Sequence, residues 1–571
     1  MRTQAAGAAP SAEPTLVELF TPKLVTVLRE GYRLGHFRSD LVAGLTVAIV
    51  ALPLSMAIAI ASGVAPAQGL YTAIVGGFLV SMLGGSRFQI GGPAGAFIVL
   101  VATTVQIHGV DGLLLATILS GFILVAGGFL RLGTYIKFVP FPVTVGFTAG
   151  IAVIIFASQL KQLLGLTLTE PEPGPLLDKL QVIWQSLPTL DPAAVGCALA
   201  TVGLIVGLKR LQPGWPGMLI AIAATATFAT LLDLRIPTIG TAFGGIPSSL
   251  PVPALPELSL AKVEAVLPSA AAFALLGSIE SLLSAVVADG MTGRRHRSNC
   301  ELVGQGIANI ASGLFGGFCV TGTIARTATN VRSGAHGPIA GMLHAVFLLL
   351  FVLIAAPLAS FIPLASLAGV LVVVAWNMIE RPAIATLLRS SLGDAAVLLA
   401  TFLLTIFRDL TEAIVVGFAL GSVLFIHRVS QTTAIETHIP FVPEDQADES
   451  RPGRTPYDEA AGDPNLVVYR ITGVFFFGAV ASIGSVLDRI SDTHRALVID
   501  FAAVPFLDST AANTIEGLTR KASRRGIKVL LTGTSRDIRR DLFVHGIKPP
   551  LVSYERTIDD AVQKLRKAPP A

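Results

Sequence analysis

Two short runs of small residues, each set in apolar surroundings, are places where bare backbone could meet an anion. The first run is Gly91–Phe97 (GGPAGAF) and the second is Thr321–Thr327 (TGTIART). Glycine and alanine allow a ligand close to the main chain, and free N–H groups at a helix start favour negative charge. The alternative is that these small residues serve only tight helix packing. We predict an anion site from Gly92, Pro93, Ala94, Gly95 and Ala96 together with Gly322, Thr323, Ile324, Ala325 and Arg326.

Arg326 is the only charged residue of the second run. A charge inside a bilayer is costly unless it pairs with another group or lines a cavity. Its guanidinium would add a fixed positive charge to the site, either touching the anion or standing behind the groups that touch it. An ion pair with Glu280 or a contact with a lipid headgroup are the alternatives.

Glu280 lies in the stretch Ala265–Val287, which contains no other charged residue. A carboxyl in such surroundings can bind a proton in one conformation and release it in another. We therefore predict that Glu280 couples transport to protons. The alternative is a permanently ionised partner of Arg326 that holds two helices together.

The remaining titratable residues do not suggest a reaction centre. Asp289, Glu301, Asp394 and Glu412 stand at the ends of apolar stretches, where a charge reaches water. His108, His336 and His344 are also near such ends, and a lone histidine is more often structural than a ligand. The cysteines, Cys197, Cys300 and Cys319, have neither disulfide nor metal-ligand spacing. No nucleophile with a base and orienter, no phosphate-binding loop and no zinc motif is present. The sequence predicts a protein that is not an enzyme and uses no metal or other cofactor.

The composition shows which elements position these residues. Of 571 residues, 52% are hydrophobic and 14% charged, against about 25% charged in an ordinary soluble domain. No Lys, Arg, Asp or Glu occurs between Asp40 and Arg87, or between Arg332 and Glu380. Each interval has room for two crossings, because one helix needs about 20 apolar residues to span a bilayer. The chain is therefore predicted to be a polytopic membrane protein.

Apolar runs predict fourteen membrane segments. Twelve are full crossings, near 41–62, 68–84, 111–131, 139–160, 193–208, 216–232, 265–288, 302–316, 337–357, 364–379, 393–407 and 411–427. The other two, 91–107 and 320–333, contain the small-residue runs and are predicted to be half-helices preceded by extended backbone. They are third and tenth in order, so two repeats of seven segments insert in opposite orientations, as in secondary transporters.

The distribution of basic residues predicts the orientation. A net charge of +4 and a pI near 9.0 could suggest nucleic acid, but the basic residues lie in short loops and indicate topology instead. Five would lie outside, namely Lys161, Lys179, Arg235, Lys262 and Arg408. Twelve would lie in the cytoplasm, namely Arg87, Arg131, Lys137, Lys209, Arg210, Arg294, Arg295, Arg297, Arg332, Arg381, Arg389 and Arg428. We predict a cell (inner) membrane protein with both termini cytoplasmic and no nucleic-acid partner.

The composition changes after Arg428. A polar segment, Glu444–Pro464, precedes three short apolar runs that are typical of buried strands, Leu466–Ile471, Ala496–Phe501 and Lys528–Gly533. Between them, 479–491 and 510–525 have helical periodicity, as in a small α/β domain. The predicted organisation is a cytoplasmic N-terminal segment, 1–39, a transport domain, 40–430, a linker, 431–464, and a soluble domain, 465–568.

The chain resembles the SulP anion permease family. The residues that carry the resemblance are Leu52–Ala57 (LPLSMA), Gly69–Tyr71 (GLY), the GGPAGAF run, Glu280–Leu283 (ESLL) and Ala325–Arg326. It implies two intertwined inverted repeats, a core domain that moves against a gate domain, and a homodimer. Many family members have Gln at the position of Leu54 and Ser at that of Ala325.

The tail resembles a STAS domain, through Asp500–Thr510 (DFAAVPFLDST). In the anti-sigma antagonists that share this domain, the position of Ser509 is phosphorylated, so the resemblance implies a regulatory Ser509. The alternative is that Asp508 or Ser509 only caps the following helix.

Within the family, Asp289–Gly293 (DGMTG) and Glu301–Gly306 (ELVGQG) resemble the bacterial C4-dicarboxylate transporter. The function expected is secondary active, proton-coupled uptake of succinate or fumarate by alternating access. Bicarbonate or sulfate uptake, anion exchange and sodium coupling stay open. A protein of another class, a membrane sensor or scaffold that responds to anions and signals through the STAS domain, is the further alternative.

Overall fold

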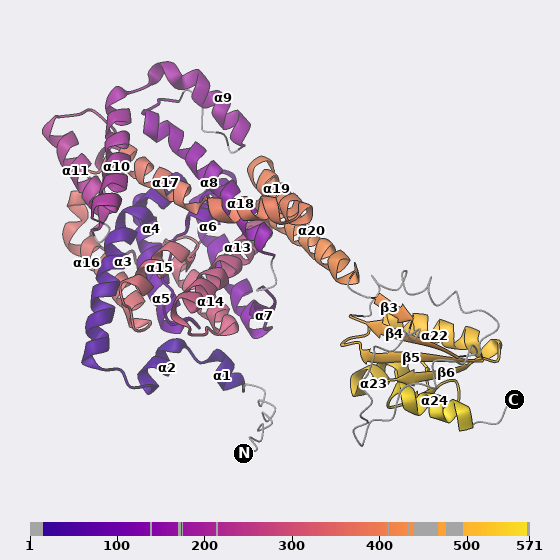
Figure 1. Cartoon of the computed structure of the whole chain (residues 1–571). Helices are drawn as coiled ribbons and strands as arrows, with labels where there is room; N and C mark the ends of the chain where they lie inside the picture. Colours follow the sequence, from indigo (N-terminus) through magenta and orange to yellow (C-terminus); the bar gives the residue numbers. More distant parts are fainter. Residues whose placement is uncertain are drawn as a thin grey trace. The chain divides into compact units, whose positions relative to one another are not determined.

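The computed structural model describes residues 15–136, 140–168, 173, 175–212, 215–408, 410–431, 434–437, 466–474 and 495–567. The chain divides into two compact units, Met1–Phe418 and Ala419–Ala571. The first is built of helices and the second contains a five-stranded sheet (Figure 1). Residues 1–14 of the predicted N-terminal segment and Lys137 lie outside the described residues, and so does the segment 438–465, which holds the predicted polar run Glu444–Pro464.

The described part of the chain contains fourteen helical segments at the predicted places. Nine helices are long and apolar enough to cross a membrane, and α11 and α19 are shorter apolar helices. The first seven segments are α3 Leu34–Ala61, α4 Pro66–Tyr71 with η1 Thr72–Gly76 and α5 Gly77–Leu83, η2 Gly95–Phe97 with the start of α6 Ile98–Phe129, the rest of α6, α8 Phe141–Leu164, α10 Pro192–Leu211 and α11 Gly217–Leu231. The second seven are α13 Leu260–Thr292, α14 Ser298–Leu314, α15 Ile324–Arg332, α16 Ile339–Ala359, α17 Leu364–Met378, α19 Leu392–Phe407 and α20 Leu410–Gln431.

Gly109 divides α6 into two segments. Its φ of 70° and ψ of −177° interrupt the helical geometry, and glycine adopts this positive φ without a steric penalty. The break separates the predicted half-helix 91–107 from the predicted crossing 111–131.

The two repeats are interwoven. One group of helices packs α6 against α13 and α14, and α3 against α16. The other packs α8 against α17 and α19, and α10 against α11 and α17. The first group corresponds to the core domain that the resemblance implies and the second to the gate domain. Gly121 of α6 and Gly306 of α14 allow these two helices to approach closely, because a Cβ on either would lie 2.6 Å from the other's carbonyl oxygen.

A two-stranded sheet joins the repeats at the small-residue runs. Strand β1, Gly91–Gly92, pairs antiparallel with β2, Thr321–Gly322, with Gly91 opposite Gly322 and Gly92 opposite Thr321. Each strand leads directly into one half-helix. The predicted extended backbone before each half-helix is therefore confirmed, and the sheet explains how two distant runs meet.

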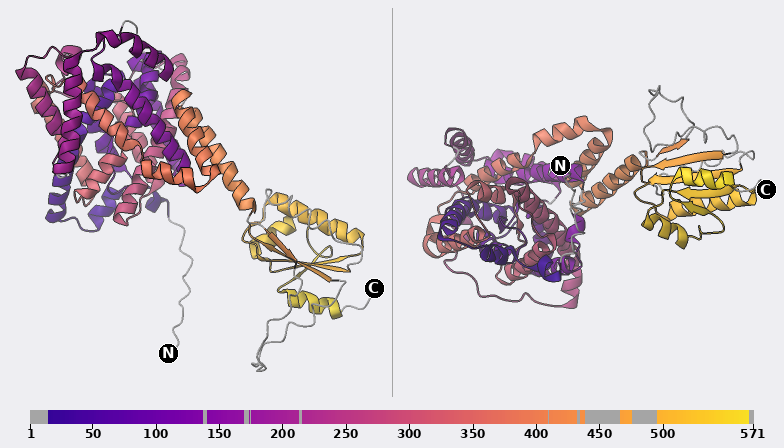
Figure 2. Two further views of the ribbon diagram at one scale, coloured as in Figure 1. Left: turned by 45° about the horizontal axis from the view of Figure 1, so that its top comes forward. Right: turned by 60° about the horizontal axis from the view of Figure 1, so that its bottom comes forward.

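The second unit has a sheet of order β3-β4-β5-β6-β7, in which only the β3–β4 pair is antiparallel. Its strands are β3 Ala434–Thr437, β4 Leu466–Thr472, β5 Ala496–Ala503, β6 Lys528–Thr532 and β7 Ser553–Glu555. Its described helices are α22 Ser509–Arg524, α23 Arg536–Val544 and α24 Ile558–Lys567, and they cover both faces of the sheet (Figure 2). The three predicted strands and the helix near 510–525 are confirmed.

Two features of this unit differ from or go beyond the sequence prediction. Strand β3 lies within the segment predicted as a linker, 431–464, so the sheet begins before residue 465. Residues 434–437 form a strand because they hydrogen-bond to β4. Their hydropathy gives little indication of this, because the segment is only four residues long. The helix predicted at 479–491 lies outside the described residues.

The remaining described helices of the first unit are short and lie at the ends of the segments. They are α1 Leu16–Phe20, α2 Lys23–Arg29, α7 Gly133–Ile136, α9 Leu176–Ser186, η3 Leu187–Thr189, α12 Ile239–Phe243 and α18 Arg381–Ser390. Both α1 and α2 pack against transport segments, α1 on α14 and α2 on α5.

Candidate anion site

The two half-helices begin without side-chain caps. Ala94 precedes η2, which continues into α6, and Thr323 precedes α15, and neither side chain accepts a hydrogen bond from the helix start. The Thr323 hydroxyl instead donates to the carbonyl oxygen of Ile90, 3.3 Å away. First-turn N–H groups have no partner inside a helix, so both starts offer donors and a positive dipole end to a ligand.

The site lies between these helix starts and the gate domain. A Cβ added to Gly95 would lie 3.2 Å from Cδ1 of Ile155 on α8 and 3.7 Å from the sulfur of Met378 on α17. Ile324 and Ala325, at the start of α15, are exposed, and Gly95 is half-buried. Movement of α8 and α17 relative to the half-helices would therefore open or close access to them.

Arg326 stands behind the first run. Its side chain is 1% exposed, and its Nη2 donates to the carbonyl oxygen of Pro93 at 3.1 Å and to the Ser55 hydroxyl at 3.3 Å. Among the residues that the structure describes, its buried Nε and Nη1 have no hydrogen-bond partner. A Cβ on Gly92 would overlap Nη1. Arg326 thus places its charge beneath Gly92 and Pro93. Its part in anion binding stays a prediction.

Glu280 faces no counter-charge in the described part of the chain. It lies on α13, which packs against α15 and β2, and its side chain is half-buried. Among the described residues it forms no hydrogen bond or ion pair, with Arg326 or with any other side chain. The structure therefore does not contain the ion pair considered from the sequence, and the coupling role of Glu280 stays a prediction.

Glu301 is fully buried, so its predicted interfacial position is wrong. Its carboxylate accepts from the backbone N–H of Ser86 at 2.9 Å and from the Ser281 hydroxyl at 3.2 Å. Nε2 of Gln89 donates to the same hydroxyl at 2.6 Å, and the Gln89 amide fills the space where Gly322 has no side chain. The side chains of Glu301, Ser281 and Gln89 therefore form a hydrogen-bonded network that extends from α14 to β2.

The sequence offered one signal for this network, the polar Gln89 two residues before the first glycine run. Glu301 gave no such signal, because a charged residue at the start of an apolar stretch is expected to be exposed to water. The helices α1, α5 and α6 cover that end of α14. His344 lies near a segment end, as the sequence predicts: it is the sixth residue of α16 and is fully buried there.

Known proteins share this architecture. The model of the sulfate permease family matches residues 37–401, and that of the STAS domain matches residues 457–562. The chain belongs to the sulfate permease family. It is 41% identical to a Bacillus subtilis (strain 168) protein named "Putative sulfate transporter YvdB", over 88% of this chain and 93% of that protein. It is 32% identical to "Bicarbonate transporter BicA" of Synechocystis sp., over 89% of this chain and 90% of that protein.

The murine Slc26a9 anion transporter in the inward-facing state has the same fold. The TM-score is 0.82 at 17% sequence identity, over 99% of this permease and 97% of that chain. The permease is thus a multi-pass anion transporter with a C-terminal STAS domain, and it is not an enzyme.

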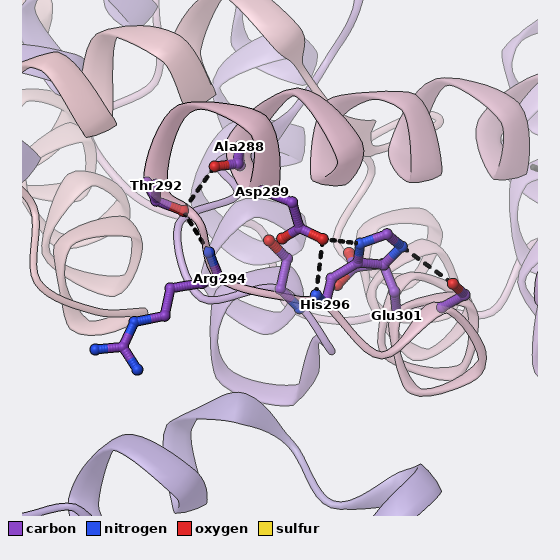
Figure 3. A network of polar contacts seen from close by, with 8 residues as sticks. Ala288, Asp289, Thr292, Arg294, His296 and Glu301 are labelled. Carbon is purple, nitrogen blue, oxygen red and sulfur yellow. Dashed lines mark hydrogen bonds and ion pairs between the residues drawn. The ribbon is translucent and has the colours of Figure 1, made fainter. Parts of the chain in front are cut away.

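The turn between α13 and α14 of the permease holds a hydrogen-bonded set that the sequence analysis missed. Figure 3 shows Asp289 and His296 pointing toward one another, with 2.7 Å between Oδ2 and Nδ1. Nε2 of His296 lies 3.0 Å from the Ser298 hydroxyl. The sequence shows no motif that would have predicted this acid, imidazole and hydroxyl contact. Asp289 also accepts the backbone N–H of His296 at 2.9 Å, so the set fastens a turn.

A second histidine cluster ties the start of α3 to the loop after α15. The rings of His36 and His336 stack with centroids 3.7 Å apart. Asp40, fully buried, accepts the backbone N–H groups of His336 at 2.6 Å and Gly337 at 3.1 Å, and the Tyr32 hydroxyl donates to it at 2.6 Å. Burial, together with nearby His36 and Arg87, holds the pKa of His336 below its ordinary value. The contact therefore favours a neutral imidazole.

In the STAS domain, Asp508 caps α22. Its Oδ1 accepts the backbone N–H of Ala511 at 2.8 Å, so the capping role falls to Asp508, and Ser509 is the exposed first residue of the helix. Asp500 is buried, pairs with Arg470 at 2.9 Å and accepts from the Thr532 hydroxyl at 2.9 Å. Phosphorylation of Ser509 stays a prediction. No group of three or more His, Cys, Asp or Glu side chains suited to a metal ion occurs among the described residues.

Proposed function

We propose that this permease is a secondary active transporter of a small oxyanion and works by alternating access. The anion binds at the uncapped starts of η2–α6 and α15. The observation that carries the proposal is the β1–β2 pair, which brings two helix N-termini together above the buried charge of Arg326. Such a site prefers anions because the positive ends of the two helix dipoles and the positive charge of the guanidinium all attract negative charge.

For the substrate we favour an inorganic oxyanion such as sulfate or bicarbonate over a C4-dicarboxylate. The dicarboxylate expectation depended on Asp289–Gly293 and Glu301–Gly306, and these segments form the α13–α14 turn and the buried contacts of Glu301. Neither segment lies at the helix starts. The relatives at 41% and 32% identity are named for sulfate and bicarbonate.

We further propose that Glu280 carries the coupling proton and that residues 40–430 perform transport. The support for Glu280 is its half-buried position, without a counter-charge, on a helix that packs against β2 and α15. The STAS domain, with β3 as its edge strand, would regulate transport from the cytoplasm through Ser509, in a homodimer of the inner membrane with both termini cytoplasmic.

Flux measurements in proteoliposomes test the proposed transport. An inward proton gradient should drive the uptake of labelled sulfate and bicarbonate, and unlabelled fumarate, succinate or chloride should compete less well. Stronger competition by fumarate would restore the dicarboxylate assignment. Anion binding without any flux would replace the transporter by the sensor or scaffold that signals through the STAS domain.

Glu280→Gln tests the coupling. The amide retains the shape but does not titrate, so anion binding and exchange of internal for external anion should survive while accumulation driven by a proton gradient is lost. Glu264→Gln, an exposed carboxylate on the same helix, is the matched control and should accumulate anion normally. If Glu280→Gln still accumulates anion with unchanged pH dependence, or if a sodium gradient alone drives uptake, the proton assignment is wrong.

A further inference from the structure

A cavity of about 800 Å³ lies within the gate domain, between α8, α10 and α17. Its wall is mostly apolar and includes Ala152 and Phe156 of α8, Val206 of α10 and Val373 of α17. No residue of the core segments lines it. Phe156 and Val206 are partly exposed, at 46% and 40%, so the cavity opens on the apolar exterior of the helices.

Two cations line one end of this cavity. Lys209 and Arg210 occupy the last turn of α10, and in the described part of the chain neither forms an ion pair. None of the lining residues is acidic. Trp376 lines the same cavity, and the guanidinium of Arg381 stacks over its ring at 3.8 Å. The cavity thus combines a mostly apolar wall with two cations.

This combination identifies the chemistry of an occupant. Cavities of roughly 300–1,000 Å³ with apolar walls and a few charged groups accommodate small amphiphiles. Lys and Arg at a membrane surface attract anionic lipid headgroups, and Trp prefers the boundary between headgroups and chains. We propose that an anionic phospholipid binds here, with an acyl chain between α8, α10 and α17 and its phosphate at Lys209 and Arg210.

The lipid site is separate from the anion site but shares two helices with it. On α8, Ile155 faces the start of η2, whereas Ala152 and Phe156 line the cavity. On α17, Met378 faces the start of η2 and Trp376 lines the cavity. A bound lipid therefore supports the two gate helices that border the anion site.

Fluorescence quenching by brominated lipids tests the site in the full-length chain. The sequence has three tryptophans, so Trp184→Phe with Trp215→Phe leaves Trp376 as the only reporter; both replaced residues are exposed. The chain is placed in vesicles of phosphatidylcholine with a minor fraction of phosphatidylglycerol. Total composition stays constant, and bromine is carried either by the phosphatidylglycerol or by an equal amount of phosphatidylcholine. We expect about twofold stronger quenching by the brominated phosphatidylglycerol.

Lys209→Gln with Arg210→Gln should equalise the two quenching values. Arg389→Gln, a basic residue of α18 that does not line the cavity, is the matched control and should keep the preference. Ala152→Phe fills the cavity and leaves both cations, so it should reduce quenching by either lipid. It serves as the second test if the double variant does not fold.

Three results would overturn the proposal. Equal quenching by the two lipids in the parent protein would show that no anionic lipid is selected. A preference that survives in Lys209→Gln, Arg210→Gln would place the selected lipid elsewhere. No quenching by either lipid would show that another structure, such as a second copy of the chain, covers Trp376.

Discussion

The two half-helix starts have equivalent backbones and different roles. Both consist of a short strand, an uncapped turn and a helix, as inverted repeats require. Gly92, Pro93 and Ala94 of the first start are buried, whereas Ile324 and Ala325 of the second are exposed. The second start also supplies Arg326, which occupies the space left free at Gly92. The two repeats thus have the same backbone pattern at the candidate site, and they differ in the side chains that they place there.

The far ends of the two half-helices differ as well. The first continues, past the break at Gly109, into the rest of α6, which packs along α13 and α14. The second ends at Arg332 and is followed by the loop that the His36–His336 contact ties to α3. One half-helix is held by packing along its continuation and the other by a polar contact at its end.

The largest expected effect concerns the inverted orientation of the repeats. In a background in which the three native cysteines are alanine, Arg295→Cys in the α13–α14 turn and Ser248→Cys in the loop before α13 introduce exposed thiols. A membrane-impermeant maleimide added outside should label only Ser248→Cys. The same reagent should label Arg295→Cys only after the vesicles are opened. Equal labelling of both cysteines from one side would contradict the opposite orientation of the two repeats, and therefore the equivalence of the two half-helix starts.

Arg326→Ala should weaken anion binding by about tenfold or more, because it removes a fixed charge from a site of low dielectric. Arg326→Lys retains the charge but loses the planar pair of donors to Pro93 and Ser55, so it should fall between the parent and Arg326→Ala. Arg332→Ala, on the exposed last turn of the same helix, is the control. Calorimetric titration with the transported anion measures all three; equal affinity in parent and Arg326→Ala would reduce Arg326 to a packing residue.

Gly92→Ala should reduce binding several-fold, since its methyl group displaces Nη1 of Arg326. Gly95→Ala should have a smaller effect, because its methyl group meets Cδ1 of Ile155 at 3.2 Å, and the end of a side chain can move. In a double-mutant cycle with Arg326→Ala, the Gly92→Ala effect should largely disappear. Additive losses would mean that Gly92 acts independently of Arg326.

The smallest expected effect is a pH dependence at the end of α15. The pKa of His336 lies below the ordinary 6.5, so the folded contact favours the neutral ring. Its stabilisation is complete above 6.5 and is lost as the pH falls through the lowered pKa. Hydrogen exchange of residues 333–338, corrected for intrinsic rates, should therefore increase on acidification in the parent. His336→Asn does not titrate there and should show a weaker increase, and identical profiles would exclude this cluster as the cause.

The sequence by itself determined the segments and their breaks. Crossings, half-helices and three strands of the tail, β4, β5 and β6, follow from local hydropathy and from glycine, which act over a few residues. The membrane strengthens this link, because every backbone group in hydrocarbon must be satisfied within its own segment or in a protein-lined cavity. The small-residue runs could be predicted because they interrupt apolar segments locally. Their backbone groups are satisfied by pairing with one another as β1 and β2.

Only the tertiary structure decided which side chains meet. Arg326 contacts Pro93 and Ser55, which lie more than two hundred positions earlier in the chain, and a local pattern carries no information about such partners. Glu301 looks interfacial in sequence and is fully buried, because helices from other parts of the chain cover its end of α14. Burial, charge pairing and cavity walls are properties of how segments pack, and two sequences with the same hydropathy can pack different residues together.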